Sequence, residues 1–96
     1  MMRVHYLLEK MGEVIGEQVD LTSRESRFVW ARTMVAYQLT EECYSLSDAG
    51  RALGKNHSTI LWARRKMKDA FALPYAYSDI IQMWNQFQDK IHHDIQ

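Results

Sequence analysis

Apolar residues recur along most of the chain at spacings of three and four, the period that predicts amphipathic α-helices. The first such stripe comprises Val4, Leu7, Leu8, Met11 and Ile15 and predicts a helix over residues 3–17. No segment shows the strict alternation of a strand, so we expect an all-α fold of about five helices. The other four stripes comprise Phe28, Ala31, Val35 and Leu39; Leu46, Ala49 and Leu53; Ile60, Ala63, Met67 and Ala70 or Phe71; and Ile80, Ile81, Trp84, Phe87, Ile91 and Ile95.

Capping and breaking residues set the expected helix ends. Thr22 stands three residues before Glu25, a capping-box spacing that predicts the start of the second helix, which should run to about Glu42. Pro74 disfavours helical geometry at the residue before it, so the fourth helix should end there. Ser78 is an expected N-cap of the last helix.

A helix, a glycine turn and a second helix follow one another in the middle of the chain. Ser45 and Asp48 have the spacing of a capping box and should open a short helix that ends at Leu53. Gly54 then accepts the left-handed conformation without a Cβ penalty, and Asn56 is a strong N-cap for the next helix. This layout is typical of a helix-turn-helix that meets DNA.

The outward face of the helix after Asn56 carries the candidate binding residues. His57, Ser58 and Thr59 occupy its first turn, where a recognition helix presents base-reading side chains. Trp62 has two interpretations: a core residue turned inward, or a surface ring that packs along sugar and phosphate. Ile60 and Ala63 already supply the buried stripe, which favours the second. The outward face is expected to comprise Ser58, Thr59, Trp62, Arg65 and Lys66.

Composition is that of one ordinary globular domain. The chain has 96 residues, of which 47% are hydrophobic and 25% charged, so we expect a single domain over residues 1–96. Cys43 is the one cysteine and cannot form an internal disulfide. The N-terminal apolar run is too short for a signal peptide, and no stretch approaches the roughly 20 apolar residues of a membrane helix. A cytoplasmic protein with no membrane partner is the expectation.

The charged residues are unevenly distributed along the chain, which the net charge alone does not show. The net charge is zero, which alone argues against nucleic acid. Residues 51–68, however, contain several cations and no acid, whereas residues 1–22 and 79–96 are net negative. Such asymmetry predicts a basic surface on a neutral molecule. Arg24, Arg27 and Arg32 lie near the start of the second helix, where the dipole disfavours cations, so an external anion is expected beside them.

At this point the residues resemble a known family, the C-terminal DNA-binding domain of the bacterial replication initiator DnaA, whose fold is like that of the Trp repressor. The family signature reads roughly S-L-x-x-I-G-x-x-[FL]-G-x-[RK]-D-H-[ST]-T-V-L-x-A, and the residue after the second glycine is sometimes absent. Residues 45–63 read SLSDAGRALGKNHSTILWA, and residues 31–37 read ARTMVAY where the family has P-R-Q-I-A-M-Y. Both motifs occur in the family's order. The resemblance implies a Trp-repressor-like helix-turn-helix and a role in bacterial replication initiation or its regulation.

The resemblance also implies roles for individual residues. In the family, the Asp, His and first Thr of the signature reach base edges in the major groove, and the Arg of the upstream motif enters the minor groove. These roles fall here on Asn56, His57, Ser58 and Arg32, and neighbouring side chains would contact phosphates or bases. The implied partner is double-stranded DNA, with no cofactor. The full candidate DNA-binding set is Arg32, Lys55, Asn56, His57, Ser58, Thr59, Trp62, Arg65 and Lys66.

The chain departs from the family at positions that affect the target. Asn56 replaces an Asp, so an amide that donates and accepts stands where a carboxylate would accept, and an adenine edge becomes a candidate contact. Ala31 replaces the Pro before the minor-groove Arg. The matching residues correspond to the family's DNA-binding domain alone, so we expect DNA binding without the initiator's ATPase activity.

Other functions find less support. Residues 50–56 resemble a phosphate-binding loop but are one residue short, lack the magnesium-binding hydroxyl and follow a helix, so nucleotide binding is rejected. His92 and His93 are adjacent and point to different sides of a helix, which disfavours a metal site. No nucleophile, base and orienter occur together, so no enzyme is expected. The alternative is a protein–protein adaptor that uses exposed aromatics, with Trp30, Trp62 and Trp84 as candidate anchors.

Overall fold

The computed structural model describes residues 2–93. These residues form five α-helices and contain no β-strand, so the predicted all-α fold of about five helices is confirmed. The described part of the chain measures 32 × 30 × 26 Å along its principal axes. The helices are α1 (Met2–Ile15), α2 (Ser26–Glu41), α3 (Leu46–Leu53), α4 (His57–Ala72) and α5 (Ser78–His93).

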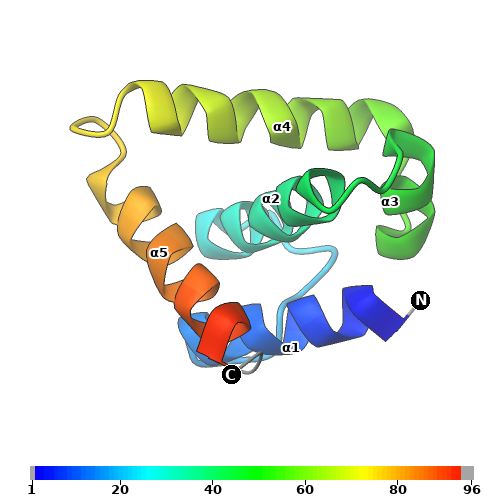
Figure 1. The fold of residues 1–96 in the computed structure, drawn as a ribbon, viewed down its shortest axis with the longest axis horizontal. Coiled ribbons are helices and arrows are strands. Elements are labelled where there is room, and N and C mark those ends of the chain that lie inside the picture. The colour runs from blue at the N-terminus through cyan, green and yellow to red at the C-terminus, as the bar shows by residue number, and fades with distance from the viewer. Residues whose placement is uncertain (1, 94–96) are drawn as a thin grey trace.

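Helix α2 lies at the centre of the molecule, with α1 on one side of it and α4 on the other (Figure 1). It packs against α1, α3 and α4. Its buried residues therefore occupy a wider part of the helix surface than the single predicted stripe. Thr33 is buried, and its hydroxyl donates to the Val29 carbonyl at 2.7 Å, which satisfies the polar group inside the core. The buried residues of α2 are Phe28, Ala31, Thr33, Met34, Val35, Ala36 and Leu39.

One connected core draws buried side chains from all five helices. In α4, Ala70 is buried and Phe71 lies at the edge of the core, 38% exposed, which resolves the choice between the two. In α5, Trp84 is half-buried, and its ring centroid lies 5.7 Å from that of Phe71. The last residue of the predicted α5 stripe, Ile95, lies outside the described residues. The stripe residues buried in α5 are Ile80, Phe87 and Ile91.

The predicted capping box at the start of α2 is wrong. Asp20 holds the preceding loop instead, because its carboxylate accepts the backbone N–H groups of Thr22 at 2.7 Å and Ser23 at 3.0 Å. These bonds, first of all the one from the Thr22 backbone, lower the pKa of Asp20. Glu25 occupies the N-cap position itself, and its side chain pairs with Arg27 without capping the helix.

The sequence predicts the last residues of α4 correctly, but it misplaces the start of α5 by one residue. α4 ends at Ala72, before Leu73 and Pro74, as the proline predicts. Ser78 is already the first residue of α5, so its predicted position as the cap is wrong by one residue. Among residues 2–93, no helix combines the length and the apolar character needed to cross a membrane.

Candidate nucleic-acid interface

Two glycines shape the turn between α3 and α4. Gly54 adopts a left-handed φ of 69° and ends α3 at the predicted position. Gly50 is buried where α3 meets the chain after the turn, and a Cβ added there would lie 2.6 Å from the Lys55 carbonyl oxygen. The Lys55 N–H donates to the Gly50 carbonyl at 2.8 Å. The missing side chain of Gly50 therefore allows α3 and the start of α4 to approach closely.

Both helices of this unit begin at the predicted N-cap. The Ser45 hydroxyl accepts the Asp48 N–H at 3.0 Å, and the Asn56 Oδ1 accepts the Thr59 N–H at 3.0 Å. Asp48 does not complete a reciprocal box, because its carboxylate pairs with Arg51. The sequence therefore predicted both caps of the helix-turn-helix unit.

The first turn of α4 is open to solvent. His57, Ser58 and Thr59 are all exposed, whereas Ile60 is 1% exposed and belongs to the core. Trp62 is 65% exposed, so the surface interpretation of this ring is the correct one. The buried positions of α4 are Ile60, Ala63, Met67 and Ala70, as the spacing predicts.

The residues predicted to form the outward face of α4 differ in their exposure and in their contacts. Arg65 is exposed and forms no ion pair with any carboxylate in residues 2–93. Lys66, however, is half-buried, and its Nζ lies 4.4 Å from the ring centroid of Trp30 on α2. The sequence does not indicate this contact, because the two residues belong to helices far apart along the chain.

Internal partners account for two of the arginines that were expected to need an external anion. Arg27 pairs with Glu17 and Glu25. Arg32 donates through Nη1 to the backbone carbonyls of Asp20 and Ser23, at 2.8 Å each. The clustering of these side chains at the start of α2 therefore does not by itself require a bound anion.

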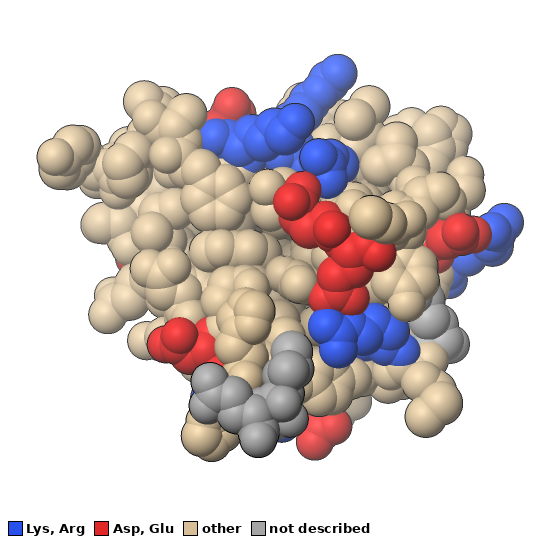
Figure 2. Space-filling view, in the orientation of Figure 1, with Lys and Arg blue, Asp and Glu red and all other residues tan. Residues whose placement is uncertain are grey.

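The basic stretch of α4 divides between two faces. Arg64 turns toward α2, where its Nη1 donates to the Thr40 hydroxyl at 2.5 Å and to Glu41 at 3.2 Å. Its guanidinium also lies 5.4 Å from the centroid of the Tyr37 ring. Lysine and arginine side chains nevertheless gather along the edge formed by α4, with acidic side chains between that edge and α1 (Figure 2).

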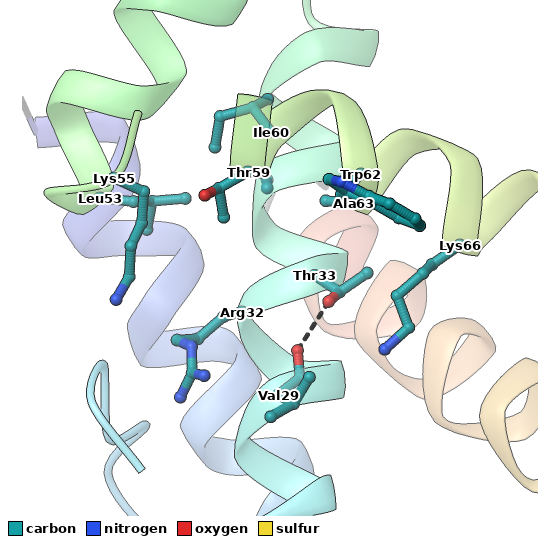
Figure 3. A pocket seen from close by; sticks show the side chains of 11 residues that line it. Val29, Arg32, Thr33, Leu53, Lys55, Thr59, Ile60, Trp62, Ala63 and Lys66 are labelled. Atoms are coloured by element: carbon teal, nitrogen blue, oxygen red, sulfur yellow. Dashed lines mark hydrogen bonds between the residues drawn. The ribbon is translucent and has the colours of Figure 1, made fainter. Parts of the chain in front are cut away.

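A hollow of about 290 Å³ brings five of the predicted residues together, although they come from α2, the turn and α4. Lys55 and Lys66 lie on opposite sides of it with Arg32 between them, and Trp62 lies beside Lys66 (Figure 3). Thr59 is the fifth. Asn56, His57, Ser58 and Arg65 do not line it. We call this hollow, with its eleven lining residues, the α2–α4 pocket. Its full lining is Val29, Arg32, Thr33, Ala36, Leu53, Lys55, Thr59, Ile60, Trp62, Ala63 and Lys66.

The two histidines near the end of α5 do not form a metal site in the described part of the chain. His92 and His93 are exposed at the end of α5, and residues 2–93 contain no cluster of three potential metal ligands. No protein-family model, curated protein or solved structure matches this chain. The functional interpretation therefore depends on the surface formed by the start of α4, the α3–α4 turn and Arg32.

Proposed function

We propose that this chain binds double-stranded DNA in a sequence-specific manner through the helix-turn-helix formed by α3 and α4. The observation that carries the proposal is the start of α4, where a capped helix presents an imidazole and two hydroxyl side chains to solvent. These groups belong to His57, Ser58 and Thr59, and no acidic side chain occurs between Arg51 and Lys68. α4 would lie in the major groove with this end toward the bases.

The physical chemistry of the helix start suits this role. Short hydroxyl and imidazole groups reach base edges closely, and the positive end of the helix dipole attracts phosphate. Arg65 and the other exposed cations of α4 would contact the DNA backbone, which supplies most of the sequence-independent affinity. Trp62, which is mostly exposed, would pack along the sugar and phosphate.

In this proposal, Arg32 would reach the adjacent minor groove. Two backbone carbonyls hold its Nη1, which fixes the side chain beside the helix-turn-helix and leaves its other N–H groups as donors. An arginine held in this way would lose little conformational entropy on binding. The narrow minor groove of A·T-rich DNA concentrates negative potential and favours such a guanidinium.

The resemblance of residues 31–37 and 45–63 to the DNA-binding domain of DnaA supports the same assignment. On that basis the process we propose is bacterial replication initiation or its regulation. The chain would act as a DNA-binding domain without catalysis, and no cofactor or nucleotide takes part.

Selection of bound duplexes from a random pool, followed by fluorescence anisotropy at several salt concentrations, tests the proposal. His57→Ala should cost about 1–3 kcal/mol on the selected site and little on random duplex. Arg65→Ala should weaken binding to both and reduce the salt slope by about one. Lys90→Ala removes the same charge from α5 and should change neither. Equal effects of the His57 and Arg65 substitutions would contradict the groove assignment.

A protein–protein adaptor is the alternative, because large apolar side chains are exposed on the first half of α4 and in the loop that follows the helix. Trp62, Leu73 and Tyr75 are 65%, 57% and 98% exposed. Absent or salt-insensitive DNA binding, together with loss of a protein partner in Tyr75→Ala, would favour the adaptor. Salt-dependent binding to a selected site would exclude it as the main function.

A further inference from the structure

The α2–α4 pocket has a chemistry that DNA binding does not explain. Its floor is apolar and consists largely of core residues: Leu53, Ile60 and Ala63 are 5%, 1% and 6% exposed. DNA contacts are made mainly by groups that project from a surface, whereas a concave apolar floor suits the apolar part of a small ligand. The pocket therefore has features of a small-molecule site.

The rim of the pocket carries three cations, and the nearest acid with a resolved interaction is Asp20, whose carboxylate lies close enough to Arg32 for a coulombic attraction. Arg32, Lys55 and Lys66 line it, and none of its lining residues is acidic. In residues 2–93, none of the three cations forms an ion pair: Arg32 bonds only to neutral carbonyls, and Lys66 lies over the Trp30 ring. An apolar floor below unpaired cations matches a molecule with an anionic head and an apolar body.

We propose that the α2–α4 pocket binds a small organic carboxylate with an apolar or aromatic body, and that this ligand competes with DNA. The volume of about 290 Å³ lies at the lower limit for ligand sites, which favours one ring and a short chain over a nucleotide. The Arg32 Nη1 donates to two backbone carbonyls of the loop. Its Nε and Nη2 groups are left to donate to a planar carboxylate. Trp62 would cover the apolar body.

Competition with DNA follows from shared side chains, and this part of the inference rests on the proposed function. Arg32, Lys55, Thr59, Trp62 and Lys66 both line the pocket and belong to the proposed DNA surface. A bound carboxylate would neutralise cations that the DNA phosphates and the minor groove also require. Ligand binding should therefore reduce the affinity for DNA, and by linkage DNA should reduce the affinity for the ligand to the same degree.

Isothermal titration calorimetry with 4-phenylbutyrate tests the pocket without DNA. We expect saturable binding, with the neutral 4-phenylbutyramide about tenfold weaker because the charge-assisted bonds are lost. Val29→Phe places a ring in the pocket from α2, outside the proposed DNA-binding set, and should abolish binding of the acid. Lys66→Gln, which keeps the pocket open, should weaken the acid about threefold or more. Circular dichroism and thermal unfolding confirm that each variant folds.

Anisotropy on the selected duplex then tests the competition. A saturating concentration of 4-phenylbutyrate should weaken DNA binding by wild type severalfold, and should leave Val29→Phe, which keeps its own affinity for DNA, unaffected. The proposed carboxylate site would be wrong if 4-phenylbutyrate showed no saturable binding, if the acid and the amide bound with equal affinity, or if Val29→Phe bound the acid as wild type does. If wild type binds the acid but no duplex, the proposed function and the competition fail while the carboxylate site stands.

Discussion

The side chain of Asn56 has two polar ends, and the structure assigns one of them to the protein itself. Oδ1 accepts the Thr59 N–H at 3.0 Å and lies 3.3 Å from the Thr59 hydroxyl. If α4 binds DNA as we propose, the amide Nδ2 is the end that would contact a base. A donor suits the acceptor edge of a purine, whereas the Asp of the DnaA family would offer a second oxygen to a cytosine amino group.

Two substitutions at Asn56 separate the cap from base recognition. Asn56→Ala should lower the free energy of unfolding by about 1 kcal/mol, because the first turn of α4 loses its cap. Asn56→Asp should keep the stability and change the preferred base at one position, with discrimination of about 1–3 kcal/mol. Urea unfolding and a repeat of the selection measure the two effects. An Asp variant that selects the wild-type site would show that Nδ2 does not contact a base.

Some side-chain positions follow from the sequence and others depend on the fold. The exposure of Trp62 is predictable, because Ile60 and Ala63 fix the buried face of a regular helix. The contact between Lys66 and Trp30 is not, since it depends on how α4 crosses α2. The α2–α4 pocket was missed for the same reason: it exists only where the packed helices leave a space.

At the level of elements, the close approach of α3 to the turn depends on Gly50. Gly50→Ala would place a Cβ 2.6 Å from the Lys55 carbonyl oxygen and 3.3 Å from the Asn56 carbonyl carbon, both parts of the backbone. The turn must then shift, which should cost about 1–3 kcal/mol and exceed the roughly 1 kcal/mol that alanine gains in a helix. Chemical unfolding should show a net loss of stability, and binding to the selected DNA should weaken as the turn moves.

Ser47→Ala is the matched control for this substitution. Ser47 is exposed on the same helix, and its replacement should change the free energy of unfolding by no more than about 0.5 kcal/mol. If Gly50→Ala were as stable as the control, α3 would not depend on the close approach that the structure shows.

Helices were easier to predict than the loops that precede them. The apolar stripes located all five helices, and the caps at Ser45 and Asn56 were correct because each residue has no stronger local alternative. Thr22 has one, since the Asp20 carboxylate accepts its N–H and its hydroxyl. The start of α2 is therefore decided by competition between two local hydrogen-bonding patterns, which the spacing of Thr22 and Glu25 does not reveal.

At the level of the whole molecule, the charges of a neutral chain are unevenly distributed over its surface. Cations line the edge formed by α4, and acidic side chains lie between this edge and α1 (Figure 2). The sequence predicted the cations of residues 51–68 and expected the acids at the two ends of the chain, but it did not indicate the role of Glu41 and Glu42, which end α2 and pair with cations of α4 and α1. It did not predict that Arg64 would turn inward to Thr40 and Glu41. Part of the charge therefore holds helices together.

A hydrogen-bonded chain of side chains joins α1, α2 and α5. Arg3 makes two bonds to the carboxylate of Glu42, just after α2, at 2.7 and 2.6 Å. Gln38 donates to the same carboxylate at 2.7 Å and accepts from Gln88 of α5 at 2.8 Å. Burial alone would raise the pKa of Glu42, but the bonds from Arg3 and Gln38 outweigh it and lower the pKa below its usual value.

This network predicts how stability depends on pH. Since the pKa of Glu42 is lower in the folded than in the unfolded chain, the folded state binds fewer protons between those two values. The stabilisation is complete above the unfolded pKa of about 4.3 and is lost as the pH falls through the folded value. Glu42→Gln should therefore cost about 1 kcal/mol at pH 7, a difference that shrinks in acid. Urea unfolding from pH 7 to pH 3 measures it, with the exposed Glu9→Gln as control. A pH-independent difference would mean that the amide is merely a poorer fit and that the charge of Glu42 does not help to hold the three helices together.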